Sequence, residues 1–347
     1  MDTIDSRIQL LEEPIIHKSS RRDFLRCVGA GVAAGLAPLI PNSNSDAEEL
    51  EEPQRSRTRL PTSNTSSVDS MLESRMDAFI KDLRRAGHLN STDGISVTVY
   101  DIDHGRKFVS IDEDVRRMAA STIKDYVMLA MFKQIENKKL NYTPKIKRLL
   151  QMSIQHSNNS ATNGLIKILG GPSQVNNILS KDFSFFKETR IVEYIPNGGR
   201  TYRNTISTHD LSIFYNQLWA GNLPYANEMK RYLSLPKRDR LFDGTCIPSG
   251  TRVLNKTGTV YGLVADSGIL VMKDDKGKTY PYIINVIIED KTKPHSKDRN
   301  GSAGWIKYRS NLIRELSEGA YDYLFQFHTG KPYICKQHNG RHLGGRQ

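Results

Sequence analysis

Apolar positions in the first third of the chain change from a helical to a strand spacing. Between residues 71 and 83 the apolar side chains recur every three or four residues, which predicts an amphipathic helix. Residues 95–100 alternate between apolar and polar types and predict a strand, and residues 107–111 predict a second strand. Because turn-forming residues separate them at Asp103-His104-Gly105-Arg106, we expect these strands to form a β-hairpin.

The middle of the chain has a helical pattern, and strand patterns return only towards the C-terminal end. Helices are predicted over residues 122–140, 144–155, 160–169, 171–179 and 208–220. Strands are predicted over 252–256, 267–272 and 282–289, followed by an amphipathic helix from 303 to about 325. This order predicts an α+β fold, in which terminal helices flank an antiparallel sheet and an all-α subdomain is inserted. The cleft between two such lobes is the expected binding site.

The N-terminal region has the layout of an export signal. Arg21 and Arg22, followed by Phe-Leu, precede a short apolar run over residues 27–40, and the pair resembles a twin-arginine signal. We therefore expect export to the periplasm or the cell exterior. The predicted segments are a signal over 1–47, a linker over 48–67, a folded domain over 68–325 and a basic tail over 326–347. Within the domain, 68–120 and 223–325 form the α/β lobe and 121–222 the helical lobe.

Composition and charge narrow the classes of protein that fit this pattern. The 347 residues include 50 Lys and Arg against 38 Asp and Glu, a net charge of +12, and no apolar stretch is long enough for a membrane span. The positive charge favours contact with an anionic cell envelope. Because no nucleic-acid-binding motif accompanies that charge, we expect no nucleic-acid partner. We expect a monomer.

Cysteine and histidine usage argues against a built metal site. Three cysteines exclude a multi-cysteine zinc site, and no His, Asp or Glu residues have metal-ligand spacing, so no metal or other cofactor is expected. Three histidines of the C-terminal region suggest adventitious metal binding at most: His328, His338 and His342. Cys246 and Cys335 remain after removal of the signal, and the sequence leaves a disulfide and two free thiols both open.

The first candidate motif for chemistry is Ser121-Thr122-Ile123-Lys124, an S-x-x-K pattern. Residues three apart on a helix share a face, so the hydroxyl and the amine can meet. A serine hydroxyl is a weak nucleophile until a base takes its proton, and a desolvated lysine can be that base. Taken alone, the pattern is more often a helix cap beside a solvated lysine, and it occurs twice more in the chain.

Two further motifs follow in order along the chain. Ser157-Asn158-Asn159 precedes a predicted helix, where the hydroxyl could relay a proton and the amide could hold a substrate carbonyl. Lys256-Thr257-Gly258-Thr259 ends a predicted strand, where the lysine supplies positive charge and the glycine permits close approach. The backbone N–H groups of Ser121 and Thr259 could together stabilise an oxyanion.

In this order the three motifs resemble those of the penicillin-recognising serine hydrolases, the superfamily of class A β-lactamases and penicillin-binding proteins. The resemblance covers roughly residues 70–325. Glu193 lies 36 residues after Ser157, with Asn197 four residues further on, a spacing similar to that of the class A Ω-loop.

The resemblance implies roles for these residues. Ser121 is the expected nucleophile, Lys124 the acylation base or relay, and Ser157 a proton shuttle, while Glu193 and Asn197 hold the water that hydrolyses the acyl-enzyme. Substrate binding is implied for Asn159, Asn197, Lys256, Thr257, Gly258 and Thr259. The implied activity is opening of β-lactam rings by a class A-type enzyme, and thus antibiotic resistance.

Several positions depart from the family pattern. Ile191 and Asn204 stand where an Arg–Asp ion pair usually fixes the Ω-loop, and Arg190 is the candidate substitute. Asp266 stands where an arginine commonly binds the substrate carboxylate, so Arg252 or another arginine must do so. Two alternatives stay open. One is a D,D-peptidase or penicillin-binding protein acting on peptidoglycan peptides, and the other a non-catalytic cell-wall-binding relative.

Overall fold

The computed structural model describes residues 70–196, 203–290, 292 and 301–333. In chain order, its elements are α3 (Met71–Arg85), β1 (Asp93–Asp101), β2 (Arg106–Ile111), β3 (Arg117–Met118), the 3-10 helix η1 (Ala120–Ile123), α4 (Lys124–Glu136), α5 (Pro144–Ile154), α6 (Asn159–Ile168), α7 (Pro172–Asp182), β4 (Thr205–Ile206), α8 (Thr208–Trp219), α9 (Ala226–Leu233), β5 (Arg252–Val260), β6 (Leu263–Lys273), β7 (Thr279–Asp290) and α10 (Gly301–Thr329). Within these ranges no helix is both long and apolar enough to cross a membrane.

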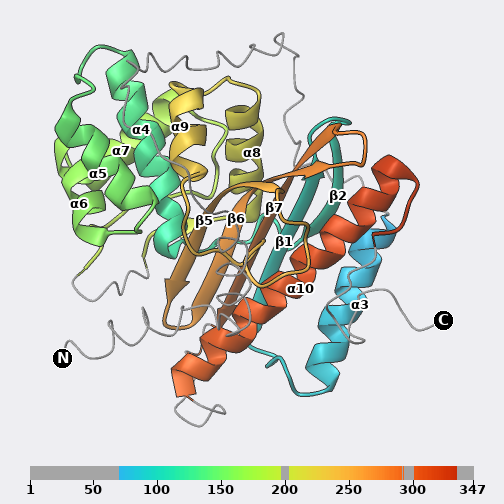
Figure 1. Cartoon of the computed structure of the whole chain (residues 1–347). Helices are drawn as coiled ribbons and strands as arrows, with labels where there is room; N and C mark the ends of the chain where they lie inside the picture. The colour runs from blue at the N-terminus through green and yellow to red at the C-terminus, as the bar shows by residue number, and fades with distance from the viewer. Residues whose placement is uncertain (1–69, 197–202, 291, 293–300, 334–347) are drawn as a thin grey trace, which may run out of the picture.

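A five-stranded antiparallel sheet in the order β2-β1-β7-β6-β5 forms the centre of the molecule (Figure 1). Helices α3 and α10 cover one face, and helices α4–α9 form a lobe on the other side (Figure 1). The α+β fold with an inserted helical region is therefore confirmed.

Alternate residues of the central strands serve two separate hydrophobic cores. On β7, Ile284, Val286 and Ile288 pack in the core under α3 and α10. Ile283 and Ile287 face the core shared with the helical lobe. Because both faces of β7 are covered, nearly the whole strand is buried, and residues 280–288, except for Asn285, are apolar instead of alternating.

Local sequence signals account for where the helices begin. Ser70 precedes α3, and its hydroxyl accepts a hydrogen bond of 3.0 Å from the Glu73 backbone N–H. Thr143 caps α5 in the same way, directly before Pro144, which lacks the backbone N–H that a helix start leaves unpaired. These caps agree with the predicted starts of both helices.

Several elements differ from the sequence prediction. The predicted helix 122–140 divides into η1 and α4 and ends at Glu136, and α9 was not predicted. All three late strands are longer than predicted, and Lys256–Thr259 lie within the C-terminal half of β5, which ends one residue later at Val260. Helix α10 continues to Thr329, because Phe327 near its end packs edge-on against Phe108 of β2. The predicted signal 1–47 and linker 48–67 lie outside the described residues.

Cys246 is disulfide-bonded, so it is not a free thiol. The chain's other cysteines, Cys27 and Cys335, lie outside the described residues. The Tyr333 hydroxyl donates a hydrogen bond to the backbone carbonyl of Cys246, which brings the described end of the chain beside this cysteine.

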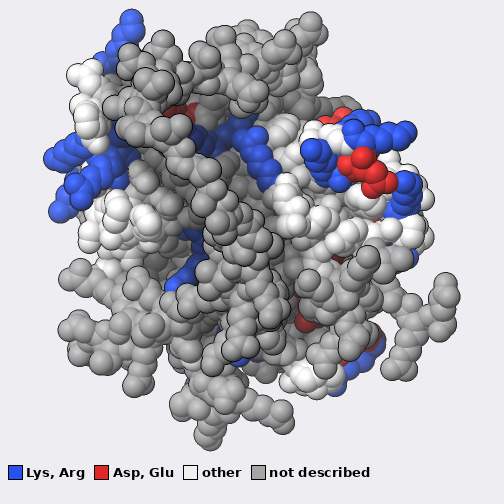
Figure 2. All heavy atoms as spheres, in the orientation of Figure 1, with Lys and Arg blue, Asp and Glu red and all other residues white. Residues whose placement is uncertain are grey.

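Exposed basic side chains gather over the helical lobe, at the left of Figure 2. The segment joining α4 to α5 and the start of α5 contribute Lys138, Lys139, Lys145 and Lys147, all exposed.

Candidate active site

Ser121 lies in the tight turn η1, directly before the long buried helix α4. The turn is entered through Ala120, whose φ of 43° is in the left-handed region that few non-glycine residues adopt. The backbone N–H of Ala119 donates a 2.8 Å hydrogen bond to the carbonyl of Asn204 and so fixes the turn from one side. Ser121 is partly exposed, and among the described residues none is hydrogen-bonded to its hydroxyl.

Lys124 is completely buried and its Nζ has three oxygen neighbours. They are the carbonyl of Ser157, the Ser157 Oγ at 3.0 Å and the Asn159 Oδ1 at 2.9 Å. Lys256 reaches the same hydroxyl from β5, with its Nζ 3.1 Å from Ser157 Oγ. The S-x-x-K, S-x-N and K-T-G motifs, which are far apart in the sequence, thus meet at one point.

The three oxygens around Lys124 Nζ are compatible with two protonation states of the amine. A charged ammonium would donate to all three oxygens, whereas a neutral amine would donate to the Ser157 carbonyl and Asn159 Oδ1 and accept a hydrogen bond from the Ser157 hydroxyl. Ser157 Oγ in turn accepts from the charged Lys256. Burial, followed by the charge of Lys256, lowers the pKa of Lys124 well below its usual value, which favours this neutral form.

Strand β5 forms an outer edge of the sheet and lies against η1. A Cβ on Gly258 would lie 3.2 Å from Thr122 Cγ2 and 3.4 Å from the Ala119 carbonyl oxygen, so glycine allows the strand to approach the turn. The hydroxyl-bearing Thr257 and Thr259 are partly exposed on either side of it. An edge strand beside a nucleophile can pair with an extended substrate.

Arg240 is a candidate functional residue that the sequence analysis missed. Its Nη2 donates a 2.6 Å hydrogen bond to Thr259 Oγ1, and its Nη1 donates to the Ala265 carbonyl at 3.1 Å. Asp266 accepts from the Arg240 backbone N–H at 2.6 Å. Arg252, the arginine named from the sequence, is exposed at the start of β5. The guanidinium beside the K-T-G-T segment therefore comes from a loop without sequence periodicity.

Asp125, the residue after Lys124, is a second group that sequence reasoning missed. The Tyr215 hydroxyl lies 2.8 Å from both Asp125 Oδ2 and the Ser267 carbonyl. One hydroxyl proton cannot serve both acceptors, so both bonds form fully only when Asp125 carries a proton. Burial raises the pKa of Asp125 to about 7, in agreement with this geometry.

Glu193 lies on the loop between α7 and α8 and is partly buried. One carboxylate oxygen accepts a 3.1 Å hydrogen bond from the Arg203 backbone N–H. The Asn204 side chain holds the backbone here, since its Oδ1 accepts from the N–H groups of Val192 at 2.8 Å and Glu193 at 3.1 Å. Asn204 also binds Ala119 through its carbonyl, so it links the loop to the nucleophile turn. Asn197 lies outside the described residues.

Uncharged side chains, together with Asp210, anchor this loop. Asn163 exchanges two 2.8 Å hydrogen bonds with the backbone of Ile195, and Asn176 does the same with Ile191 at 2.6 and 2.8 Å. Asp210 accepts from the backbone N–H groups of residues 187–189. The expected substitute Arg190 is exposed and donates to the carbonyl of its neighbour Thr189, so the amides, and not an arginine ion pair, replace the usual anchor.

Comparisons with known proteins show the family and the fold of the chain. A family model described as the β-lactamase enzyme family matches residues 77–148 and 141–324. No significant match was found among curated proteins. A structure of PBP-A has a TM-score of 0.60 at 19% identity and covers 77% of this chain and 100% of that chain.

Two further solved structures have the same fold. A point mutant of PBP-A, solved as an acyl-enzyme complex with penicillin G, has a TM-score of 0.58 at 19% identity, covering 74% of this chain and 96% of that chain. The ancestral class A β-lactamase of the last common ancestor of Gram-negative bacteria has a TM-score of 0.57 at 20% identity, covering 72% of this chain and 99% of that chain.

Fold, motif convergence and family match together define a β-lactam- or penicillin-binding serine hydrolase. The chain belongs to the β-lactamase enzyme family, whose model spans most of its described residues.

Proposed function

We propose that the protein is an exported class A-type hydrolase that opens β-lactam rings through an acyl-enzyme on Ser121. The observation that carries this proposal is the meeting of Lys124 and Lys256 on the Ser157 hydroxyl, at 3.0 and 3.1 Å. In this arrangement the Ser157 hydroxyl lies between the neutral amine of Lys124 and the charged amine of Lys256. The nucleophile Ser121 precedes Lys124 by one helical turn.

In the acylation step, Ser121 Oγ attacks the lactam carbonyl carbon and its proton passes to the neutral Lys124. The new C–O bond gives a tetrahedral oxyanion, and the lactam C–N bond breaks when this intermediate collapses. The proton then moves from Lys124 through Ser157 Oγ to the departing lactam nitrogen, so that the amine is neutral again. Lys256 keeps the relay hydroxyl oriented and stabilises charge that develops beside it.

The substrate is held along the outer edge of β5. The backbone N–H groups of Ser121 and Thr259 stabilise the tetrahedral oxyanion. Asn159, whose Oδ1 accepts from Lys124, directs its Nδ2 towards a substrate carbonyl. The substrate carboxylate binds Lys256 and the Thr257 and Thr259 hydroxyls, with Arg240 behind Thr259 adding positive charge.

Deacylation requires a water molecule beside the Ser121 ester. We assign its activation to Glu193, with Asn197 as the second group that holds it. The link through Asn204, which binds the backbones of both Glu193 and Ala119, supports this assignment, since it fixes the loop relative to the nucleophile turn. Water adds to the ester carbon as Glu193 takes its proton, and the ester C–O bond to Ser121 then breaks as Glu193 returns that proton to Ser121 Oγ, so both groups are restored.

Intact-protein mass spectrometry of the chain mixed with benzylpenicillin, followed over time, tests this proposal. We expect a transient adduct and released penicilloic acid. Ser121→Ala should form no adduct. Glu193→Gln should accumulate the adduct, whereas Glu188→Gln, a substitution on the same loop, should behave as the wild type.

Other outcomes would favour the alternatives. A long-lived wild-type adduct that Glu193→Gln does not prolong would indicate a D,D-peptidase, a class consistent with the fold similarity to PBP-A. No adduct on the wild type would overturn the β-lactam proposal and favour a different ester or peptide substrate, or a non-catalytic role.

A further inference from the structure

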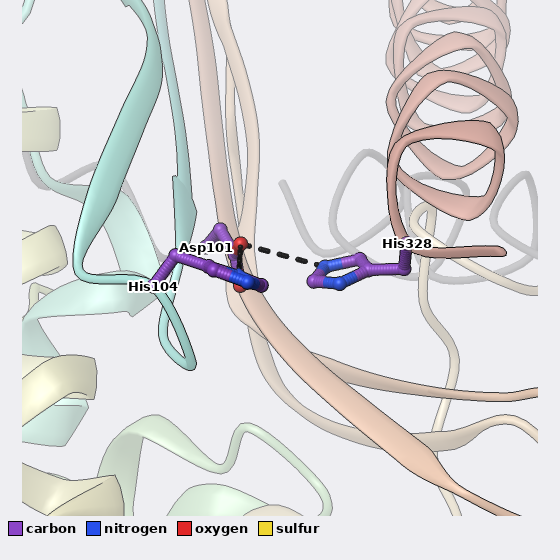
Figure 3. Close-up of side chains that lie close together, drawn as sticks. All are labelled: Asp101, His104 and His328. Atoms are coloured by element: carbon purple, nitrogen blue, oxygen red, sulfur yellow. Dashed lines mark hydrogen bonds and ion pairs between the residues drawn. The ribbon is translucent and has the colours of Figure 1, made fainter. Parts of the chain in front are cut away.

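Three side chains that could hold a metal ion lie close together (Figure 3) at the end of β1, which two strands separate from β5. Asp101 is the last residue of β1, His104 lies in the turn between β1 and β2, and His328 is near the end of α10. Their potential ligand atoms all lie within 4.8 Å of one another. Strands β7 and β6 separate this cluster's strand β1 from β5, so the cluster is not part of the Ser121 site.

The Asp101 carboxylate is shared between the two imidazoles. Its Oδ2 lies 2.7 Å from His104 Nδ1 and 3.4 Å from His328 Nε2. Its Oδ1 accepts a 3.2 Å hydrogen bond from the Asp103 backbone N–H, which fixes the orientation of the carboxylate. Oδ2 is then the carboxylate oxygen that can coordinate a metal ion.

His328 provides an independent indication that a ligand is bound here. Its side chain is only 2% exposed, yet within the described part of the chain its Nε2 has no hydrogen-bond partner. That nitrogen faces the Asp101 carboxylate (Figure 3). Asp101 Oδ2 lies 3.4 Å from it and forms an ion pair with the imidazole when the imidazole is protonated, whereas a metal ion between the two atoms would satisfy both with a neutral imidazole.

One separation, that between Asp101 and His328, matches tetrahedral coordination as it stands. Ligand atoms at about 2.0–2.2 Å from a zinc ion lie about 3.3 Å apart in a tetrahedron. The separation of 3.4 Å between Asp101 Oδ2 and His328 Nε2 matches that edge. His104 must withdraw slightly from its 2.7 Å contact, and its side chain, which is 55% exposed on a turn, has room to do so.

Aromatic rings hold both imidazoles in place. Tyr280 packs on His328 with ring centroids 4.4 Å apart, and Phe327 meets His104 edge-on at 5.5 Å. Such packing limits rotation of the ligands and lowers the entropy cost of assembling a site.

We propose that Asp101, His104 and His328 bind one divalent late first-row transition metal ion, with Zn²⁺ the best match. Two imidazoles and one carboxylate oxygen are ligands that this class prefers, and the exposed side of His104 leaves a fourth position to water. The ion joins the C-terminal end of α10 to the β1–β2 turn, and it thereby stabilises the helix that covers one face of the sheet.

Calorimetric titration of the full chain with Zn²⁺, repeated with Co²⁺ followed by visible absorption, tests this site. We expect one tight site per chain with tetrahedral Co²⁺ bands, and no comparable binding of Mg²⁺. His104→Gln should weaken the affinity by at least about tenfold. Because His104 is exposed, that variant should still fold, and it should acylate with benzylpenicillin as the wild type does.

Matched controls separate this site from adventitious binding. His156→Gln, at an exposed histidine elsewhere, and the tail variant His338→Gln/His342→Gln should keep the wild-type affinity. Zn²⁺ at about 100 times its Kd should raise the ratio of folded to unfolded protein about 100-fold in the wild type and in both controls. Absence of a tight site, equal affinity in His104→Gln, or loss of binding only in the tail variant would each overturn the proposal.

Discussion

At the residue scale, burial decides the protonation states of the groups behind the nucleophile. Lys124 and Lys256 share one serine hydroxyl, and the first of them has its pKa lowered by burial and by the charge of the second. Asp125, one residue further on, has its pKa raised by the same burial. Opposite shifts in adjacent residues are the pattern that tuned active sites commonly have.

Asp125→Asn should change how stability depends on pH. The folded-state pKa of about 7 lies above the unfolded value of 3.8, so the folded chain binds this proton more tightly. Stability from this group is therefore full at low pH and is lost as pH rises from about 4 through about 7. The asparagine, which has a similar shape and does not ionise, should remove that loss, on the order of a few kcal/mol at pH 8.

Urea unfolding at several pH values between about 4.5 and 8 measures this difference. Asp77→Asn, at an exposed ion pair with Lys81, serves as the control and should track the wild type. Equal pH dependence in Asp125→Asn and the wild type would contradict a proton on Asp125.

At the element scale, the close approach of β5 to η1 brings the K-T-G motif to the nucleophile. The approach depends on Gly258, since a Cβ there would lie within 3.4 Å of atoms of Ala119, Ala120 and Thr122, the residues that surround Ser121. The same glycine has an ordinary strand conformation, so space and not backbone strain explains its presence.

Gly258→Val should therefore push β5 away from η1 and slow acylation more than tenfold, with a stability loss of about 1–3 kcal/mol from overpacking. Gly258→Ala should also slow acylation and lower stability, but by less than Gly258→Val. The acylation rate with benzylpenicillin and the urea midpoint report the two effects separately. Gly164→Ala is the control. Gly164 lies in helix α6, and a Cβ there would be 3.5 Å from the Leu149 side chain, an ordinary van der Waals distance. Unchanged acylation in Gly258→Val would show that the approach is not needed.

At the scale of the whole molecule, the C-terminal segment is joined to the body of the protein at more than one point. Helix α10 covers the sheet, and Tyr333 beyond it contacts Cys246, which is disulfide-bonded. Cys335 follows Tyr333 by two residues, so we expect it to be the partner of Cys246. An oxidising compartment, as the proposed export implies, would keep such a bond.

Cys246→Ser should lower the free energy of unfolding by about 2–5 kcal/mol under non-reducing conditions, and Cys335→Ser should do the same. Peptide mapping without reductant identifies the bonded pair, and thermal unfolding with and without reductant measures its contribution. Cys27→Ser should leave both results unchanged. A map that joins Cys246 to Cys27, or a melting temperature insensitive to reductant, would contradict this pairing.

The sequence by itself determined the types and order of most elements and the three motifs of the site. Caps such as Ser70 and Thr143, apolar periodicity and the serine–lysine spacing are local properties, so they can be read along the chain. Helix α9 escaped prediction because it has only eight residues, and η1 because a strained Ala120 begins it.

Only the tertiary structure decided which distant residues meet. Arg240 reaches Thr259, Asn204 joins Ala119 to Glu193, and Asp210 anchors a loop that begins 23 residues earlier, none of which has a local signal. His328 is far from Asp101 in the sequence but lies beside it in the fold. Residues without the spacing of metal ligands along the chain therefore come close enough in space to bind one ion. Long-range pairing depends on how the two faces of the sheet are covered, and that packing is a property of the whole chain.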